Sequence, residues 1–108
     1  MEYHKKSSKA EAIARKNDLI RKNLRGAIIL LTPGVQSLSE KDREALFQKI
    51  REFEDFNEGN DPYGEHDFGA VNHNGVKYFF KFDYLDDSLK YFKEDGNRVL
   101  TIMRADEY

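Results

Sequence analysis

A tight-turn signal between two alternating stretches constrains the fold of this chain more than any other feature. Asn72-His73-Asn74-Gly75 contains the Asn-Gly pair that favours a hairpin turn. In Val76–Tyr84, which follows, aromatic residues occupy every second position from Tyr78 on, as expected of a strand with one buried face. His66–Val71 precedes the turn and is predicted to be the partner strand. An antiparallel hairpin is therefore expected to organise the C-terminal part of the chain.

The turn allows two registers of this hairpin. A two-residue turn places His66 opposite Asp83 and directs Glu65 and Asp67 toward the aromatic face. A three-residue loop with a glycine bulge instead places Glu65 opposite Asp83 and Asp67 opposite Lys81. Because burying unpaired carboxylates against phenyl rings is costly, the sequence favours the bulged hairpin.

The remaining segments predict two helices and two more strands. Apolar periodicity predicts helices over residues 8–25 and 39–55, the second capped by Ser39. Ala27–Leu31 is a continuous apolar run that predicts a buried strand, and Arg98–Arg104 predicts another strand. Between strands, Leu85–Asn97 is a polar excursion that can include a short helical turn.

This order of elements predicts the fold class. An α-β-α-β-β-β chain folds most simply as an α+β domain, a mostly antiparallel four-stranded sheet with two helices on one face. Residues 1–7 are expected to form a disordered arm, and residues 8–108 a single domain.

The composition excludes several kinds of site. The chain has no cysteine, so it has no disulfides, thiolate metal sites or cysteine nucleophiles. No apolar run approaches the roughly 20 residues of a membrane span, and no signal-peptide pattern is present at the start. We therefore expect a cytoplasmic protein that does not associate with membranes.

Charge is distributed unevenly along the chain. Residues 1–25 carry eight lysines and arginines against three acidic residues, a net charge of +5, whereas residues 26–108 carry ten against seventeen, a net charge of −7. A basic first helix, with Arg15, Lys16 and Lys22, can bind nucleic acid or an acidic protein. The alternative is a solvated helix face that complements the acidic remainder of the domain.

The segment Asp61–Gly69 holds the strongest candidate for a reactive site. Both registers bring Asp83 next to Glu65-His66-Asp67, and neighbouring carboxylates either share a proton or hold a cation. Glu65, His66, Asp67 and Asp83 are therefore candidate catalytic residues, and Glu65 and Asp83 are candidate ligands for Mg²⁺ or Mn²⁺.

A structural interpretation of the same residues stands beside the reactive one. The carboxylates can accept backbone N–H groups or pair with Lys81 or Arg98, and a histidine on an apolar face is more often hydrogen-bonded core than ligand. His73, in the turn, is expected to be exposed. Aromatic residues near charges also suit a protein contact surface, and the candidates for that surface are Tyr63, Tyr84, Tyr91 and Phe92.

Several motifs together resemble a family of small proteobacterial proteins known as domain of unknown function 3768. The motifs are Asn17-Asp18, Leu31-Thr32-Pro33-Gly34-Val35, Asn60–Gly69, Lys81-Phe82-Asp83-Tyr84, Arg98–Met103 and Glu107-Tyr108. The resemblance runs from about Ile13 to the C-terminus, and it departs at Leu85–Asn97. It implies an association with plasmids and other mobile elements, and it implies no specific activity.

Three functions from different classes fit the sequence. The first is a protein-binding or accessory module of a mobile genetic element, including a counter-defence role as inhibitor of a host nucleic-acid-targeting system. The second is a metal-dependent or acid–base hydrolase or nuclease centred on Glu65, His66, Asp67 and Asp83. The third is a nucleic-acid binder that uses the basic first helix. A protein partner is the leading expectation.

Overall fold

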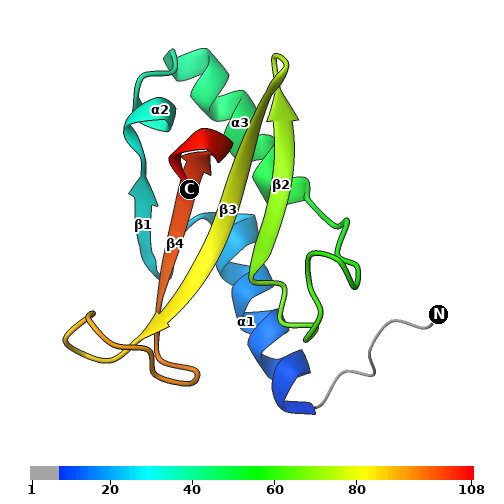
Figure 1. Cartoon of the computed structure of the whole chain (residues 1–108), viewed down its shortest axis with the longest axis vertical. Coiled ribbons are helices and arrows are strands. Elements are labelled where there is room, and N and C mark those ends of the chain that lie inside the picture. The colour runs from blue at the N-terminus through cyan, green and yellow to red at the C-terminus, as the bar shows by residue number, and fades with distance from the viewer. Residues whose placement is uncertain (1–7) are drawn as a thin grey trace.

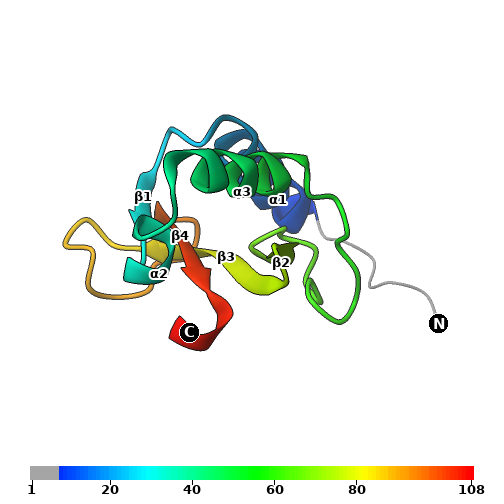
Figure 2. The ribbon, with the colours of Figure 1, turned by 90° about the horizontal axis from the view of Figure 1, so that it is seen from above.

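The protein is built on one four-stranded sheet. In the computed structural model, which describes residues 8–108, the elements in chain order are α1 (Ser8–Asn23), β1 (Ile28–Leu31), α2 (Pro33–Gln36), α3 (Glu40–Glu52), β2 (Phe68–His73), β3 (Val76–Leu85), β4 (Asn97–Arg104) and the 3₁₀ helix η1 (Ala105–Glu107). Figures 1 and 2 show α1 and α3 on the same face of the sheet. The predicted α+β class and element order are confirmed. The predicted arm of residues 1–7 lies outside the described residues.

The sheet is mixed, with strand order β1-β4-β3-β2. The pairs β2–β3 and β3–β4 are antiparallel, whereas β1 runs parallel to β4 at one edge. Because β1 is an edge strand, Ile28 and Leu30 remain 41% and 50% exposed, and only Ile29 and Leu31 pack against the core. The prediction of a buried strand here is therefore wrong, since only one face of β1 is covered.

The hairpin adopts the two-residue turn, so the predicted bulged register is wrong. Asn74 and Gly75 both have positive φ, 51° and 78°, and their flanking residues pair directly. Gly69 then lies opposite Phe80, where a Cβ atom would approach the Phe80 ring to 2.4 Å. The glycine leaves room for the ring. Regular pairing also begins only at Phe68, so the carboxylates that seemed to forbid this register lie in the loop before the strand.

The hairpin tip is tied to α3 by a buried histidine. His73 was predicted to be exposed, but it is only 8% exposed. Its Nε2 lies 3.1 Å from Asp42 Oδ1, and its Nδ1 lies 3.2 Å from Lys49 Nζ, which also donates to the Asn72 carbonyl at 2.7 Å. A carboxylate on one nitrogen and a lysine on the other favour the tautomer with the proton on Nε2.

The Thr-Pro-Gly turn begins a short helix, α2, that is held by the C-terminal segment. Glu107 accepts hydrogen bonds from the Thr32 hydroxyl at 2.6 Å and from the Gly34 amide at 2.8 Å. A Cβ atom on Gly34 would come within 2.5 Å of the Glu107 carboxylate. Two motifs far apart in sequence therefore meet in one structural contact.

The core lies between the two long helices and the sheet, and it contains two polar residues of α1. Apolar core residues come from every layer: Ile13, Ile20, Leu46, Ile50, Phe80, Phe82, Leu100 and Ile102. On the same buried stripe of α1, Asn17 and Arg21 are 0% and 1% exposed. Polar side chains this deeply buried need partners inside the fold, and their partners define the first candidate site.

Candidate functional site

A buried polar network joins α1 to the segment before β2 and to the end of β3. Asn17 Nδ2 donates to the Tyr84 hydroxyl at 2.9 Å and to the Glu65 carbonyl at 3.0 Å. The Tyr84 hydroxyl in turn donates to Glu65 Oε1 at 3.1 Å, and Arg98 Nε donates to Asn17 Oδ1 at 3.1 Å. Burial raises the pKa of Tyr84 well above its usual value, so its hydroxyl remains protonated. Glu65 is therefore engaged by the fold itself.

His66 lies between two carboxylates in the same region. Its Nδ1 lies 2.9 Å and 3.0 Å from the two oxygens of Asp18, and its Nε2 lies 3.6 Å from Asp61 Oδ2. The imidazole stacks on the Phe56 ring with centroids 3.9 Å apart. The His66 backbone has a φ of 56°, and its amide donates to Asp61 Oδ1 at 2.9 Å. This conformation is uncommon for histidine, and the contacts around the ring hold it in place.

Arg21 connects this network to the C-terminal end of α3. Its Nη1 donates to the carbonyls of Ile50 and Arg51 at 2.9 Å and 3.1 Å, and its Nη2 donates to Asp18 at 3.0 Å. A cation is favourable at a helix C-terminus, where the last carbonyls lack helical partners. Arg21 thus satisfies α3 and orients the Asp18 carboxylate that contacts His66.

Asp67 has the most perturbed carboxyl group of the predicted site. Burial and the nearby carboxylates of Glu65 and Asp61 raise its pKa to about 6. Asp83 does not complete a carboxylate pair with Glu65, as the bulged register predicted. It lies on the outer face of β3 and pairs with Lys81 at 3.1 Å, whereas Glu65 binds the core-facing Tyr84. Asp83 therefore does not pair with Glu65, although its charge still contributes to the raised pKa of Asp67.

The predicted metal ligands are not grouped into a site. Within residues 8–108, no cluster of three or more histidine or acidic side chains has the arrangement needed to hold a metal ion. Glu65 and Asp83, the candidate ligands for Mg²⁺ or Mn²⁺, engage Tyr84 and Lys81 respectively. What this region does chemically, from the bonds it makes, is hold α1, α3 and the sheet together.

The predicted contact residues divide by exposure. Tyr84 is 7% exposed, so its assignment to a contact surface is wrong: the residue alternates with Asp83 and therefore faces the core. Tyr63, Tyr91 and Phe92 are at least 70% exposed. Arg15, Lys16 and Lys22 are also exposed on α1.

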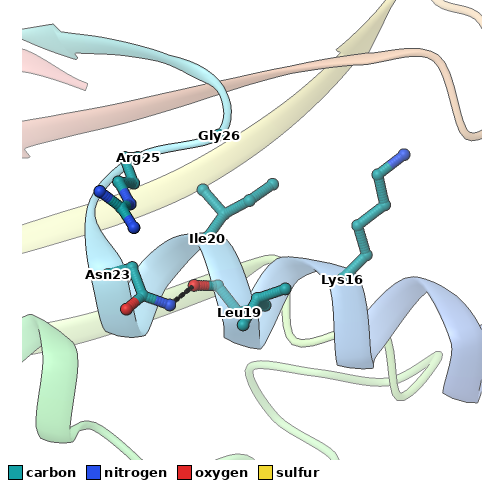
Figure 3. Close-up of a pocket in the computed structure, with 6 residues that line it drawn as sticks. All are labelled: Lys16, Leu19, Ile20, Asn23, Arg25 and Gly26. Carbon is teal, nitrogen blue, oxygen red and sulfur yellow. Dashed lines mark hydrogen bonds between the residues drawn. The ribbon is translucent and has the colours of Figure 1, made fainter.

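A second candidate site lies on the other side of α1. Three hollows with volumes of about 360, 250 and 520 Å³ adjoin one another, and Gly26 lines all three. We refer to them together as the Gly26 groove. It runs from the C-terminal half of α1 past the start of β1 to the loop of residues 86–96, which protrudes at the lower left of Figure 1. Figure 3 shows the first hollow, bordered by Leu19 and Ile20 of α1 and by Arg25 and Gly26.

The Gly26 groove combines exposed apolar side chains with charged ones. Leu19, Ile28 and Leu89 line it and are 66%, 41% and 42% exposed. Its second hollow is mainly polar and is bordered by three cationic residues, Lys16, Lys93 and Arg98, and two carboxylates, Asp87 and Asp95. Large exposed apolar side chains that are bordered by charged residues are typical of protein contact surfaces.

The loop that forms one wall of the groove is not helical, contrary to the suggestion of a helical turn within Leu85–Asn97. Residues 86–96 form turns, and an isolated bridge joins Leu85 to Phe92. Leu89 and Asp95 both have left-handed φ values, 60° and 52°. Asp86 holds the loop by accepting from the Ser88 hydroxyl at 2.6 Å and from the Lys90 amide at 3.3 Å.

Sequence reasoning missed the two buried arginines and the groove. From composition alone, Arg21 and Arg98 are expected on the surface like other charged residues, but each is at most 4% exposed. A signal was available for Arg21, which follows Asn17 by four residues on the buried stripe of α1. No local pattern indicates the groove, because its residues come from two stretches far apart in the sequence, residues 16–28 and 87–98.

Comparison with known proteins yields one finding. Residues 31–107 match the family model described as protein of unknown function, DUF3768, which is more than two thirds of the chain. Neither the curated proteins nor the solved structures contain a significant match. The region described in residues 8–108 also has no helix with the length and apolarity needed to cross a membrane.

Proposed function

The chain belongs to the DUF3768 family, and we propose that it is a protein-binding module that docks its partner in the Gly26 groove. The single observation that carries this proposal is that exposed Leu19, Ile28 and Leu89 line hollows that share Gly26 as a border. Exposed leucines that border a concave surface give an apolar partner residue an area to bury.

The neighbouring loop supports the same proposal. Tyr91 and Phe92 are 70% and 74% exposed and lie in the loop that forms one wall of the groove. Aromatic residues contribute much of the binding energy of protein interfaces because they bury large areas at low entropic cost. Lys16, predicted as a contact residue, borders two of the three hollows.

Two of the carboxylates that a hydrolase would use are engaged within the fold: Glu65 accepts from Tyr84, and Asp83 pairs with Lys81. Next to Glu65, His66 lies between Asp18 and Asp61. We therefore assign the Asp61–Asp67 segment the task of fixing α1 on the sheet, so that the groove on the other side of α1 keeps its shape.

The more specific form of the proposal concerns biological context. A cytoplasmic accessory protein of a mobile element would have a host protein as its partner, and in the counter-defence role this partner belongs to a nucleic-acid-targeting system. The residues of the groove define how such a partner is held, and identification of the partner tests the biological role separately.

Partner capture with paired variants tests the proposed function. The chain is expressed with an affinity tag in its natural host, and copurifying proteins are quantified for the parent chain and for Leu19→Asp, Leu89→Asn and Tyr63→Ser. Asparagine suits position 89 because it tolerates left-handed φ better than most residues. Tyr63 is the matched control, being 77% exposed and distant in sequence from the groove segments.

The proposal predicts a stoichiometric partner that is lost with Leu19→Asp and with Leu89→Asn and is kept with Tyr63→Ser. Thermal melts of each variant check that the fold is intact. Retention of the partner by both folded groove variants contradicts the proposal, as does a partner lost only with Tyr63→Ser.

A further inference from the structure

One buried side chain at the Gly26 groove has an unused hydrogen-bond donor. Arg98 is 4% exposed; its Nε donates to Asn17 and its Nη1 donates to Asp95 and, at 3.2 Å, to the Gly96 carbonyl. Its guanidinium carbon lies 4.8 Å from the centre of the Tyr84 ring. Arg98 Nη2 is shielded from solvent and has no acceptor in the part of the chain that the structure describes. A charged donor without an acceptor is unfavourable in a folded protein.

The carboxylate that pairs with Arg98, that of Asp95, bonds to only one nitrogen of the guanidinium. A carboxylate binds arginine best through two parallel hydrogen bonds, one to each nitrogen of the fork. Asp95 is bonded to Nη1 alone. Its side chain is 53% exposed, and its backbone is left-handed with a φ of 52°. Asp95 is thus an accessible, singly bonded carboxylate on a buried arginine, and an incoming carboxylate can compete with it.

We infer that the Gly26 groove binds an acidic peptide segment of a protein partner, in which a carboxylate replaces Asp95 on Arg98 and apolar side chains pack against Leu19 in one hollow and against Ile28 and Leu89 in another. This inference rests on the proposed function and specifies the chemistry of the partner. The replacing carboxylate accepts from Nη1 and Nη2 together, so it satisfies the donor that Asp95 leaves unused.

The charges around Arg98 agree with an acidic ligand. Lys16 and Lys93 border the same hollow, and with Arg98 they outnumber Asp87 and Asp95. When a ligand displaces the Asp95 side chain from Arg98, the basic excess near the guanidinium increases. Opposite charges at an interface steer association and select partners.

The apolar wall favours a peptide over a nucleic acid. Leu19, Ile28 and Leu89 offer aliphatic surface for a side chain, whereas a phosphate backbone requires mainly cationic contacts. The ligand therefore combines one acidic residue with at least one large apolar residue nearby.

The test uses a defined peptide and the full chain. The probe is an acetylated and amidated hexapeptide of alternating leucine and glutamate, compared with the same peptide containing glutamine and with an oligothymidylate of eight nucleotides. Binding is followed by NMR through the amides of Gly26, Leu89 and Gly96 and the Nε–H of Arg98. The leucine–glutamate peptide is expected to shift these signals saturably, and the glutamine peptide to bind about tenfold more weakly.

The direction in which Asp95→Asn changes the affinity for the peptide tests the inference most directly. Removing the competing carboxylate is expected to increase affinity for the leucine–glutamate peptide about threefold to tenfold, whereas a purely structural contact would leave affinity unchanged or reduce it. Asp87→Asn is the matched control: Asp87 borders the same hollow but accepts from Asn97 at 3.0 Å and has no bond to Arg98. It removes the same charge and should increase affinity less.

Each other outcome counts against the inference. It is overturned if the leucine–glutamate peptide causes no saturable shift up to millimolar concentration, or if the glutamine peptide binds equally well. Tighter binding of the oligothymidylate at these amides assigns the groove to nucleic acid and also overturns it. If Asp95→Asn and Asp87→Asn increase affinity equally, the increase comes only from the lost negative charge. This result overturns the claim that a peptide carboxylate replaces Asp95 on Arg98.

The proposed function can survive these failures. If partner capture depends on Leu19 and Leu89 but no carboxylate dependence is found, the protein-binding role stands and its acidic specificity falls. If the groove variants keep their partner, the protein-binding proposal itself fails, whatever the peptides show.

Discussion

The two sides of α1 differ in what they contact: one is packed against the fold and the other borders an open groove. On one side, Asn17, Asp18 and Arg21 are bonded to the sheet, to His66 and to the end of α3. On the other side, Lys16 and Leu19 border the Gly26 groove, where Arg98 keeps an unpaired donor. A helix of 3.6 residues per turn separates these sets by roughly half a turn, so one helix can support a buried interface and an open one. Within the described residues each side has one buried guanidinium nitrogen without an acceptor, Arg21 Nε and Arg98 Nη2. The two sides therefore differ in exposure: the carboxylate-rich side is packed within the fold, and the other borders a groove.

The largest effect on this contrast is expected from Arg21→Ala. The change leaves the Ile50 and Arg51 carbonyls without their donor and frees Asp18 from its charge partner. We expect a loss of about 3 kcal/mol in the free energy of unfolding, measured by urea denaturation. Lys22→Ala, at the exposed neighbouring position, is the control and should change it by at most about 0.5 kcal/mol. Equal effects of the two variants would show that the Arg21 contacts contribute little.

Substitutions at two glycines compare a tightly packed position with one that borders the open groove. Gly69→Ala places a Cβ atom 2.4 Å from the Phe80 ring and 2.9 Å from the Phe53 ring, so overpacking should cost about 2 kcal/mol. Gly26→Ala meets only Ile20, at 3.6 Å, and its cost of about 1 kcal/mol comes from a φ of 91°. Urea denaturation of both variants measures the difference, and a larger loss at Gly26 would contradict this description of the packing.

The fold was largely predictable because local patterns carry it. The Asn-Gly turn, the alternating aromatics of β3 and the Ser39 cap of α3 each identify an element without tertiary information, and Ser39 does accept from the Asp42 amide at 3.1 Å. The hairpin register was not predictable in this way. It depends on the Phe80 ring, which occupies the space above Gly69. There the ring packs against Phe53, which follows α3.

The candidate site was predictable only in part, for a related reason. The sequence correctly draws attention to Glu65, His66 and Asp67, but the partners that satisfy Glu65 and His66 come from α1 and β3. Only the pairing of Asp83 with Glu65 depended on the bulged register, which is wrong. The Gly26 groove arises where α1, β1, β4 and the loop of residues 86–96 meet, so no single segment could reveal it.

A smaller effect is expected from Tyr84→Phe. The variant keeps the ring in the core and removes the hydroxyl that donates to Glu65 and accepts from Asn17. The free energy of unfolding should fall by about 1.5 kcal/mol in urea denaturation. Tyr91→Phe, which removes an exposed hydroxyl, is the control and should have almost no effect. An unchanged Tyr84→Phe protein would mean that this hydroxyl is not part of a stabilising network.

The pH dependence of stability tests Asp67, the carboxyl group of this region whose pKa is raised. The folded-state pKa of Asp67 is raised to about 6, so the folded protein holds this proton more tightly than the unfolded chain. The contribution of Asp67 to stability should therefore decrease as the pH rises from about 4 to about 6, so the parent protein should lose stability relative to Asp67→Asn over this range. Asp67→Asn should remove this decrease and raise stability at pH 7 by about 1 kcal/mol, a value reduced from the full shift because the side chain is partly exposed to solvent. Denaturation at pH 4, 5, 6 and 7 measures it, and a stability that increases over this range only in the parent protein would contradict the assignment.

The smallest effect on stability is expected in the groove. Leu89→Asn removes an exposed side chain from a left-handed position, so the free energy of unfolding should change by at most about 0.5 kcal/mol. Partner binding should nevertheless be lost. A variant that is strongly destabilised in urea denaturation would show that Leu89 supports the fold and is not a free contact.

Hydrogen exchange of the captured complex tests the central contrast most directly. Amide exchange of the full chain is compared with and without its partner, under identical conditions. The account predicts new protection at Gly26, at residues 86–96 and at the start of β1, with little change at residues 61–67. Protection confined to residues 61–67, with none around Gly26, would contradict it.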